Sequence, residues 1–301
     1  MRKKVLAIYY TQSGQLEEIV NNFTSPFESS GVMVEKVRVW PNDDFEFPWT
    51  SERFFDAMPE SVKEVPVPLQ PFSLQEEAYD LIIFAYQPWF LSPSIPATSI
   101  LVHPTFLQVV RNTPVITLIG SRNMWLSAQE KIKIALQKAG ANLVGNVALI
   151  DRNNNLVSAV TILYWMLTGK KDQYLGIFPK PGVSNEDIAS VTSYGAIAKD
   201  SLLKEDWEGL QHELVAAKAV EVKPDLMFIE SRGARLFSIW GNLISKRKNR
   251  SPWLTLFKYY LLVALFIVAP IVVTINNLLF RHFFKKQIKR KQNYYLGLRT
   301  K

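Results

Sequence analysis

The chain has 301 residues, of which 48% are hydrophobic, so it can form one large or two modest domains with a substantial core. It contains no cysteine, which excludes disulfides, thiolate nucleophiles and cysteine-based metal sites, and its three histidines are too far apart in sequence to favour a zinc site. The net charge of +8 is unevenly distributed: residues 241–301 hold 13 Lys and Arg and no Asp or Glu, which leaves 22 basic and 27 acidic residues in a mildly acidic body.

Apolar and β-branched runs alternate with helical patterns in the first half of the chain. The runs at 4–10, 31–40, 79–86, 113–121 and 142–150 predict five strands, and residues 14–27 have apolar side chains at helical spacing. Such alternation predicts an α/β fold with a five-stranded parallel sheet and helices on both faces. In sheets of this kind ligands bind beyond the carboxyl ends of the strands.

A second helix is predicted at residues 127–141. Ser127 is suited to cap its first turn, Glu130 completes a capping box, and Gly140 provides the C-terminal stop.

The remaining segments of the body carry weaker patterns. Residues 41–78 form a proline-rich insertion, expected to be a long loop with a short helix that acts as a lid or as part of a substrate wall. From about residue 155 to 218 the pattern is mainly helical, so residues 1–218 form the expected α/β domain with a helical extension. Residues 219–252 are expected to be a basic, irregular connector.

The chain ends in an apolar segment with basic flanks. Residues 259–280, YYLLVALFIVAPIVVTINNLLF, carry no formal charge, and as a helix they span about 33 Å, close to the hydrocarbon thickness of a bilayer. We therefore expect a membrane segment at 253–284 and a basic tail at 285–301, with a membrane rather than a nucleic acid as partner. The basic residues are Lys246, Arg247, Lys248, Arg250 and Lys258 before the run, and Arg281, Lys285, Lys286, Lys289, Arg290 and Lys291 after it.

The orientation of this segment stays open. Because both flanks are basic, the positive-inside rule does not choose between a shallow in-plane or re-entrant segment and a single tilted span. The apolar run after the N-terminus is too short for a signal peptide. We therefore expect a membrane-associated protein whose main domain is cytoplasmic.

A polar loop follows the first predicted strand, with the sequence Thr11, Gln12, Ser13, Gly14, Gln15. Backbone N–H groups entering a helix form an anion site, hydroxyls add donors, and glycine permits close approach. The loop contains neither the GxGxxG fingerprint of dinucleotide sites nor a Walker motif. The alternatives are a tight turn and a phosphate site, for which FMN is the best candidate ligand.

This loop resembles the phosphate loop of the flavodoxin family, which pairs hydroxyl residues with a glycine. The match lies at Thr11, Ser13 and Gly14, whereas Leu16 stands where the family has a hydroxyl. The resemblance implies a flavodoxin-like fold, FMN as cofactor, and a second loop beside the flavin ring. That second loop is YQPWFLSPSIP, where Tyr86, Trp89 and Phe90 are available to stack on the ring. The equally weighted alternative is that Trp89 and Phe90 pack on the core or on the insertion at 41–78.

The third loop of the expected site is GSRNMWLS, after the fourth predicted strand. Gly120 opens it, and Ser121 and Asn123 can bond polar atoms of the flavin ring. Arg122 is the candidate catalytic residue, since it can stabilise negative charge on the flavin or on an enolate. The alternative is a surface arginine. The general base is left open among Tyr9, Tyr10, Asp151 and His103.

Taken together, IYYTQSGQLEEI, YQPWFLSPSIP, GSRNMW and the basic apolar C-terminus resemble a family labelled dialkylresorcinol condensing enzyme. Condensation of acyl thioesters normally uses a cysteine nucleophile, which this chain lacks, so a ketosynthase partner is expected to perform that step. The resemblance implies a pathway in which a lipophilic cyclohexanedione loses two hydrogens, and a flavin can accept them. A flavin-free membrane scaffold and an NAD(P)H:quinone-type reductase are the alternative functions.

Overall fold

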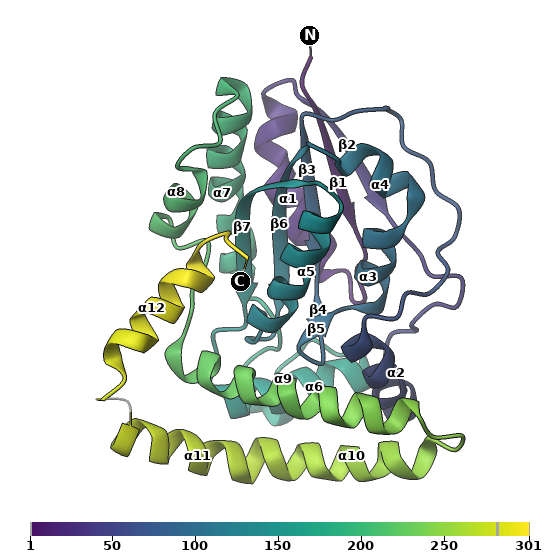
Figure 1. Ribbon diagram of the computed structural model, residues 1–301, viewed down its shortest axis with the longest axis vertical. Coiled ribbons are helices and arrows are strands. Elements are labelled where there is room, and N and C mark those ends of the chain that lie inside the picture. Colours follow the sequence, from purple (N-terminus) through teal and green to yellow (C-terminus); the bar gives the residue numbers. More distant parts are fainter. Residues whose placement is uncertain (1, 281–282, 301) are drawn as a thin grey trace.

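The fold is a doubly wound α/β sheet. The computed structural model describes residues 2–280 and 283–300; Arg281 and His282 of the expected membrane region lie outside the described residues. Strands β1 (Lys4–Tyr9), β2 (Met33–Arg38), β3 (Leu81–Tyr86), β6 (Pro114–Ser121) and β7 (Asn142–Ile150) are parallel and lie in the order β2-β1-β3-β6-β7 (Figure 1). The predicted five-stranded parallel sheet is confirmed.

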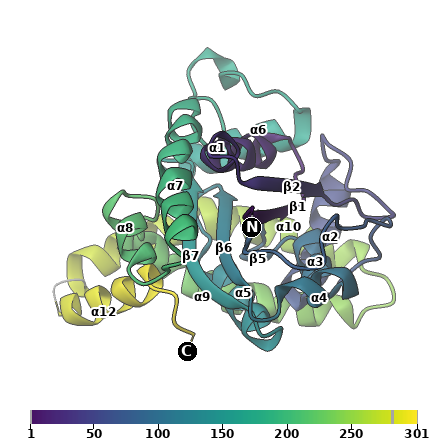
Figure 2. The same cartoon turned by 90° about the horizontal axis from the view of Figure 1, so that it is seen from above.

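Helices cover both faces of this sheet, as its apolar strands require (Figure 2). On one face lie α1 (Gln15–Ser29), α7 (Asn185–Lys204) and α8 (Leu210–Ala216). On the other lie α3 (Ile95–Val102), α4 (Pro104–Val110) and α5 (Leu126–Lys138). Every residue of β3 is buried between the two layers.

The helical extension supplies part of the first layer. Helix α7 lies so close to α1 that a Cβ built on Gly195 would come within 2.1 Å of the carbonyl oxygen of Phe23. Gly195 is therefore a requirement of close helix packing. Before α7, the extension contains α6 (Asn155–Thr168) and the short helix η1 (Tyr174–Gly176).

The predicted capping box of α5 is wrong. The helix begins at Leu126, and its first turn is capped by the carboxylate of Glu230, whose Oε1 accepts from the N–H of Ser127 at 2.6 Å. Glu130 instead pairs with Lys133 and accepts from the hydroxyl of Tyr294. A carboxylate supplied from about 100 residues downstream replaces the local one, which no local pattern could indicate. The predicted stop at Gly140 agrees with its φ of 77°.

The expected irregular connector is also wrong over most of its length. Residues Pro224–Ser245 form a 22-residue helix, α9. Pro224 suits the first turn, Asp225 complements the helix dipole, and Met227, Glu230 and Ile244 are among its buried positions. Tertiary packing of this apolar face stabilises the helix, which itself contains Arg232 and Arg235. The denser basic cluster, at 246–250, lies beyond its end.

The insertion at 41–78 contains a longer helix than expected, α2 (Ser51–Lys63). The hydroxyl of Thr50 caps it by accepting from the N–H of Arg53 at 3.1 Å. Helix α2 packs on α9 through a cluster that includes Met58, Val62 and Ile244.

The apolar C-terminal segment is a continuous helix that lies along α9 below the sheet (Figure 1). It comprises α10 (Ser251–Val263), π-helical η2 (Ala264–Val268), α11 (Ala269–Ile275) and π-helical η3 (Asn276–Phe280). Proline lacks an N–H, and the wider η2 turns precede Pro270. Within the described residues, Ser251–Ile275 is the one helix long and apolar enough to cross a membrane. Helix α12 (Lys285–Leu296) then returns to the body.

Gly195→Ala should destabilise the fold by roughly 2 kcal/mol or more, because the new methyl group overlaps the backbone of α1. Denaturant unfolding followed by circular dichroism measures the loss. Gly297→Ala is the matched control, since its Cβ would meet ordinary contacts at 3.5 Å. An unchanged midpoint for Gly195→Ala would contradict the packing described.

Candidate functional site

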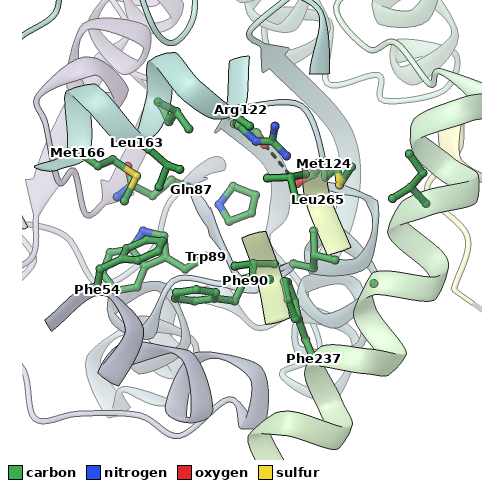
Figure 3. A pocket seen from close by; sticks show the side chains of 18 of the residues that line it. Phe54, Gln87, Trp89, Phe90, Arg122, Met124, Leu163, Met166, Phe237 and Leu265 are labelled. Atoms are coloured by element: carbon green, nitrogen blue, oxygen red, sulfur yellow. Dashed lines mark hydrogen bonds between the residues drawn. The ribbon is translucent and has the colours of Figure 1, made fainter. Parts of the chain in front are cut away.

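A cavity of about 560 Å³ lies at the carboxyl edge of the sheet. The three predicted loops meet there, because they follow β1, β3 and β6. Figure 3 shows Trp89 and Phe90 of the second loop and Arg122 of the third at this cavity. The opposite walls come from α2, α6, α9 and the continuous C-terminal helix formed by α10, η2, α11 and η3, which we call the apolar helix. The predicted site residues that line the cavity are Gln12, Ser13, Gln15, Trp89, Phe90, Gly120, Ser121 and Arg122; Thr11, Gly14, Tyr86 and Asn123 lie outside the lining.

The first loop has the geometry of a tight turn into a helix. Gly14 has a φ of 85°, which favours glycine, and its N–H donates to Oγ1 of buried Thr11 at 3.1 Å. Helix α1 begins at Gln15, so the N–H groups of its first turn have no acceptor within the helix. Ser13 places a hydroxyl at the cavity beside this turn.

The two glutamines of this loop fasten neighbouring segments. Gln15 donates to the carbonyl of Val183 at 3.0 Å and accepts from its N–H at 3.1 Å. The amide of Gln12 donates to the carbonyls of Phe45 and Glu46, and its oxygen accepts from the hydroxyl of Tyr10 at 3.1 Å. These side chains therefore attach the first loop to the segments around Phe45 and Val183, beside the cavity.

Position 16 belongs to the core. Leu16 is 2% exposed, and its Cδ1 would lie 3.3 Å from a Cβ at Gly120. Its side chain thus packs under the third loop, where a hydroxyl would be buried.

A half-buried lysine near the first turn of α1 was missed from the sequence. Burial lowers the pKa of Lys171; Glu18 of α1 raises it and Lys180 lowers it. Its Nζ lies 5.2 Å from the ring centroid of Trp165, a cavity-lining residue. In the sequence, the pair Lys170–Lys171 after an apolar helix only weakly indicates an anion site. The fold is needed to bring this segment close to α1.

The second loop is a two-residue hairpin held in an unusual conformation. Strands β4 (Pro88–Trp89) and β5 (Ser92–Pro93) are joined by Phe90 and Leu91, whose φ angles are 49° and 60°. Two successive left-handed residues are typical of Asn-Gly turns, so bulky residues here cost of order 1–3 kcal/mol each. Packing offsets this strain: Phe90 lies 4.8 Å from Phe54, and Leu91 fits against Gly233 of α9.

Trp89 packs on the insertion and also lines the cavity. Its ring meets Phe45 at 5.0 Å and Trp49 at 5.2 Å, both edge to face. Tyr86 points away into the core, where its hydroxyl donates to Gln129 at 2.8 Å. Gln87, which was not predicted from the sequence, lines the cavity in place of Tyr86. Because side chains alternate along a strand, the residue after buried Tyr86 could have been expected to point the other way.

In the third loop Arg122 lies at the cavity (Figure 3). Its Nη1 donates to the backbone oxygen and Oδ1 of Asn155 at 3.0 and 3.1 Å. Burial lowers the pKa of Arg122 to about 10, against the opposing effects of Asp151 and Glu230, so it remains a cation at neutral pH. Ser121 donates to the carbonyl of Met124 at 3.3 Å, and buried Asn123 donates to Asn155.

None of the four candidate bases lines the cavity. The hydroxyl of Tyr9 donates to Glu17 at 3.0 Å, and that of Tyr10 to Gln12. Buried Asp151 accepts from the hydroxyl of Ser158 and the N–H of Asn153, each at 2.9 Å, and His103 lies at the start of α4. Among the described residues that line the cavity there is no Asp, Glu, His or Lys.

The cavity is therefore an apolar chamber with two cations at its surface, Arg122 and Arg232. Most of its lining is aromatic or aliphatic, as in sites for lipophilic molecules. The aromatic and thioether contributors from the insertion, α6 and α9 are Phe47, Trp49, Phe54, Phe55, Trp165, Met166, Phe228 and Phe237.

Comparisons with known proteins give no family. No protein-family model and no curated protein matches the chain. Solved structures similar to it include a flavoprotein of Lactobacillus acidophilus in complex with FMN, with 18% identity, a TM-score of 0.39, and coverage of 48% of this chain and 93% of that one. A flavoprotein of Bacteroides eggerthii has 14% identity, a TM-score of 0.40, and coverage of 51% and 91%. At these values the similarities decide nothing about function.

Glu230 should make stability depend on pH. Burial raises its pKa from 4.5 to about 7, so the folded protein holds this proton more tightly than the unfolded chain. The stabilisation is fully present below pH 4.5 and is lost as pH rises through about 7, with a total change of about 3 kcal/mol.

Unfolding of wild type and Glu230→Gln across this pH range measures the effect. The difference between the two should change with pH, while exposed Glu208→Gln follows the wild type. Parallel curves for wild type and Glu230→Gln would show that Glu230 does not titrate in this window.

Proposed function

We propose that the protein is a membrane-associated, FMN-dependent oxidoreductase that aromatises a lipophilic cyclohexane-1,3-dione to a resorcinol. The observation that carries this proposal is the convergence of three loops, from the ends of β1, β3 and β6, on one apolar cavity with two arginines. The loops suit a flavin mononucleotide and the remaining walls suit an alkyl-chained substrate.

The first loop offers groups for the phosphate. The N–H groups at the start of α1 and the Ser13 hydroxyl are hydrogen-bond donors, and Gly14 has open space around its missing Cβ. Lys171 lies in the same region and can supply positive charge. Backbone donors and a lysine would thus replace the hydroxyl that is absent at Leu16.

The second and third loops offer groups for the flavin ring. Trp89 and Phe90 form an aromatic wall, and Gln87 and Ser121 place polar atoms at the same cavity. When bound, FMN supplies an acceptor for a hydride.

The cavity favours an anionic enolate as substrate. A 1,3-dione is acidic because its enolate is conjugated through two carbonyls, and Arg122 and Arg232 are cations that can hold such an oxygen. The absence of a carboxylate, histidine or lysine from the described lining agrees with a substrate that arrives already deprotonated. The aromatic and aliphatic walls would receive the alkyl chains.

The reaction removes two hydrogens from the ring. As an enolate, the substrate has already lost a proton to water from a carbon beside a carbonyl. A hydride would leave the adjacent carbon for the acceptor that bound FMN supplies, and tautomerisation would then give the resorcinol. Arg122 and Arg232 would stabilise the charge on oxygen, and the apolar walls would exclude water. A ketosynthase partner would form the ring in dialkylresorcinol biosynthesis, because this chain has no cysteine for acyl transfer.

A flavin-free membrane scaffold is the second candidate, favoured by a specific observation. The polar side chains of the first loop are largely committed to structure: Thr11 accepts from Gly14, and Gln12 and Gln15 bind neighbouring backbone. An NAD(P)H:quinone-type reductase that uses the same cofactor is the other alternative. Its substrate would be a neutral quinone, whereas the main proposal has an anionic enolate as substrate.

The purified full-length protein should bind FMN with a visible flavin spectrum. Ser13→Asp should weaken FMN binding at least tenfold, through charge repulsion with the phosphate, and leave riboflavin binding nearly unchanged. Lys171→Gln should have the same selective effect, and exposed Ser193→Asp on α7 should have none. Titration of flavin fluorescence gives the affinities. Failure to bind supplied FMN would favour the scaffold.

With FMN bound and an artificial electron acceptor, the protein should convert a dialkylcyclohexane-1,3-dione to its resorcinol. Arg232→Gln and Arg122→Lys should raise KM for the dione about tenfold, because they weaken binding of the enolate, while any reduction of a neutral quinone stays unchanged. Product analysis by chromatography and steady-state kinetics measure both. Faster turnover of quinone than of dione would identify a quinone reductase.

A further inference from the structure

One side of the apolar helix is exposed along its whole length. From Leu256 to Ile275, exposed apolar residues recur every three or four positions, which places them on one face. We call this face the apolar stripe: Leu256, Tyr259, Val263, Ile267, Ile271 and Ile275, with exposed fractions between 44% and 60%. A continuous apolar face of this length requires a partner.

The other side of the helix is fastened to the body at its N-terminal end. Phe257 is fully buried in a cluster with Phe55, Phe237 and Trp240. Beside it, Arg250 pairs with Glu60 at 2.6 Å. Leaving the body would remove the Phe257 ring from this packing, which disfavours detachment of the helix.

The chain after the helix is fastened to the same body. Gln292 of α12 donates to the carbonyl of Val222 at 2.9 Å, and Tyr294 donates to Glu130 of α5 at 2.7 Å. Gln211 of α8 donates to the carbonyl of Leu296 at 2.8 Å. Both ends of the apolar helix are thus tied to one domain.

Both ends also carry exposed positive charge. Basic side chains flank the stripe where α9 ends and where α12 begins. The exposed members are Lys246, Arg247 and Lys248 at one end and Lys285, Lys286, Lys289, Arg290 and Lys291 at the other. Clusters of this kind attract anionic lipid headgroups.

We propose that the apolar stripe lies in the plane of one anionic leaflet, so that the protein is monotopic. A crossing helix would carry α12 about 30 Å away, to the opposite side of the bilayer from α5 and α8, with which it forms hydrogen bonds. An in-plane helix keeps those contacts, buries the stripe among acyl chains and places both basic clusters at headgroups of the same leaflet.

The in-plane helix also suggests how the proposed substrate enters the cavity, and this part of the inference rests on the proposed function. Other positions of the same helix line the cavity, among them Tyr260, Leu261, Leu265, Val268, Ala269 and Val272. The element that contacts lipid is therefore also a wall of the cavity, so a lipophilic substrate reaches the cavity from the leaflet without passing through water. The membrane contact itself does not require a flavin.

Flotation of the full-length protein with vesicles tests the contact. It should bind phosphatidylcholine vesicles that contain phosphatidylglycerol, and added salt or the triple change Lys285→Gln, Lys286→Gln and Lys289→Gln should weaken binding. Ile267→Glu with Ile271→Glu should reduce binding at least tenfold, whereas Leu203→Glu, at an exposed leucine of α7, should bind as wild type. Undiminished binding of the stripe variant, or self-association by that face without binding to vesicles, overturns the proposal.

The orientation is tested with single cysteines, because the chain has none of its own. On vesicles with the main domain outside, a membrane-impermeant maleimide should label Asn249→Cys and Asn293→Cys equally. A fluorophore at Ile267→Cys should be quenched more by lipids spin-labelled near the headgroup than near the chain end. Protection of Asn293→Cys, or deeper quenching, would establish a span. Since neither readout involves FMN, loss of flavin binding alone would contradict only the proposed function.

Discussion

The buried ring of Phe257 fixes the apolar helix against α2 and α9, and the architecture of the carboxyl edge depends on that contact. A doubly wound sheet normally leaves its ligand loops open at this edge. Here the insertion, α9 and the apolar helix close over them, and the loops become the floor of an apolar chamber. The cap of α5 by Glu230 is the second attachment of α9, so that one helix is held by apolar packing and by a buried carboxylate.

This closure changes the role of the polar residues in the first loop. In an open site Gln12 and Gln15 would be free for a ligand, whereas here they bind the backbone of the segments that form the walls. The phosphate donors that remain are the N–H groups of α1 and the Ser13 hydroxyl, with Lys171 nearby. The second loop likewise holds Phe90 and Leu91 in left-handed conformations because Phe54 and Gly233 pack against them. The energy of a strained turn is thus offset by the packing that encloses the cavity.

The composition of the cavity and the exposure of the apolar helix both suit a lipophilic, anionic molecule at a membrane surface. Two arginines in an apolar surrounding suit an oxyanion on a lipophilic molecule, and such a molecule partitions into membranes. In the proposed membrane contact, the apolar stripe and its basic flanks would place a leaflet directly against the wall of that cavity. The proposed substrate and the proposed membrane contact therefore arise from the same helix.

The sequence by itself determined the sheet and the edge at which the three polar loops meet, because strand burial follows from local apolar runs, and loops at strand ends converge in any doubly wound fold. It also placed Gly14 and Arg122 on loops at this edge; Arg122 lines the cavity, whereas Gly14 lies outside the lining. Contacts between distant segments were decided by tertiary structure alone: Glu230 replaced Glu130 at the cap of α5, and α9 formed where charge suggested a connector. The same holds for Leu16 and Tyr86, whose side chains point into the core, and for Lys171, which returns to α1. Local pattern encodes which residues are buried, but a hydrogen-bond partner or a cavity wall exists only after the chain has folded.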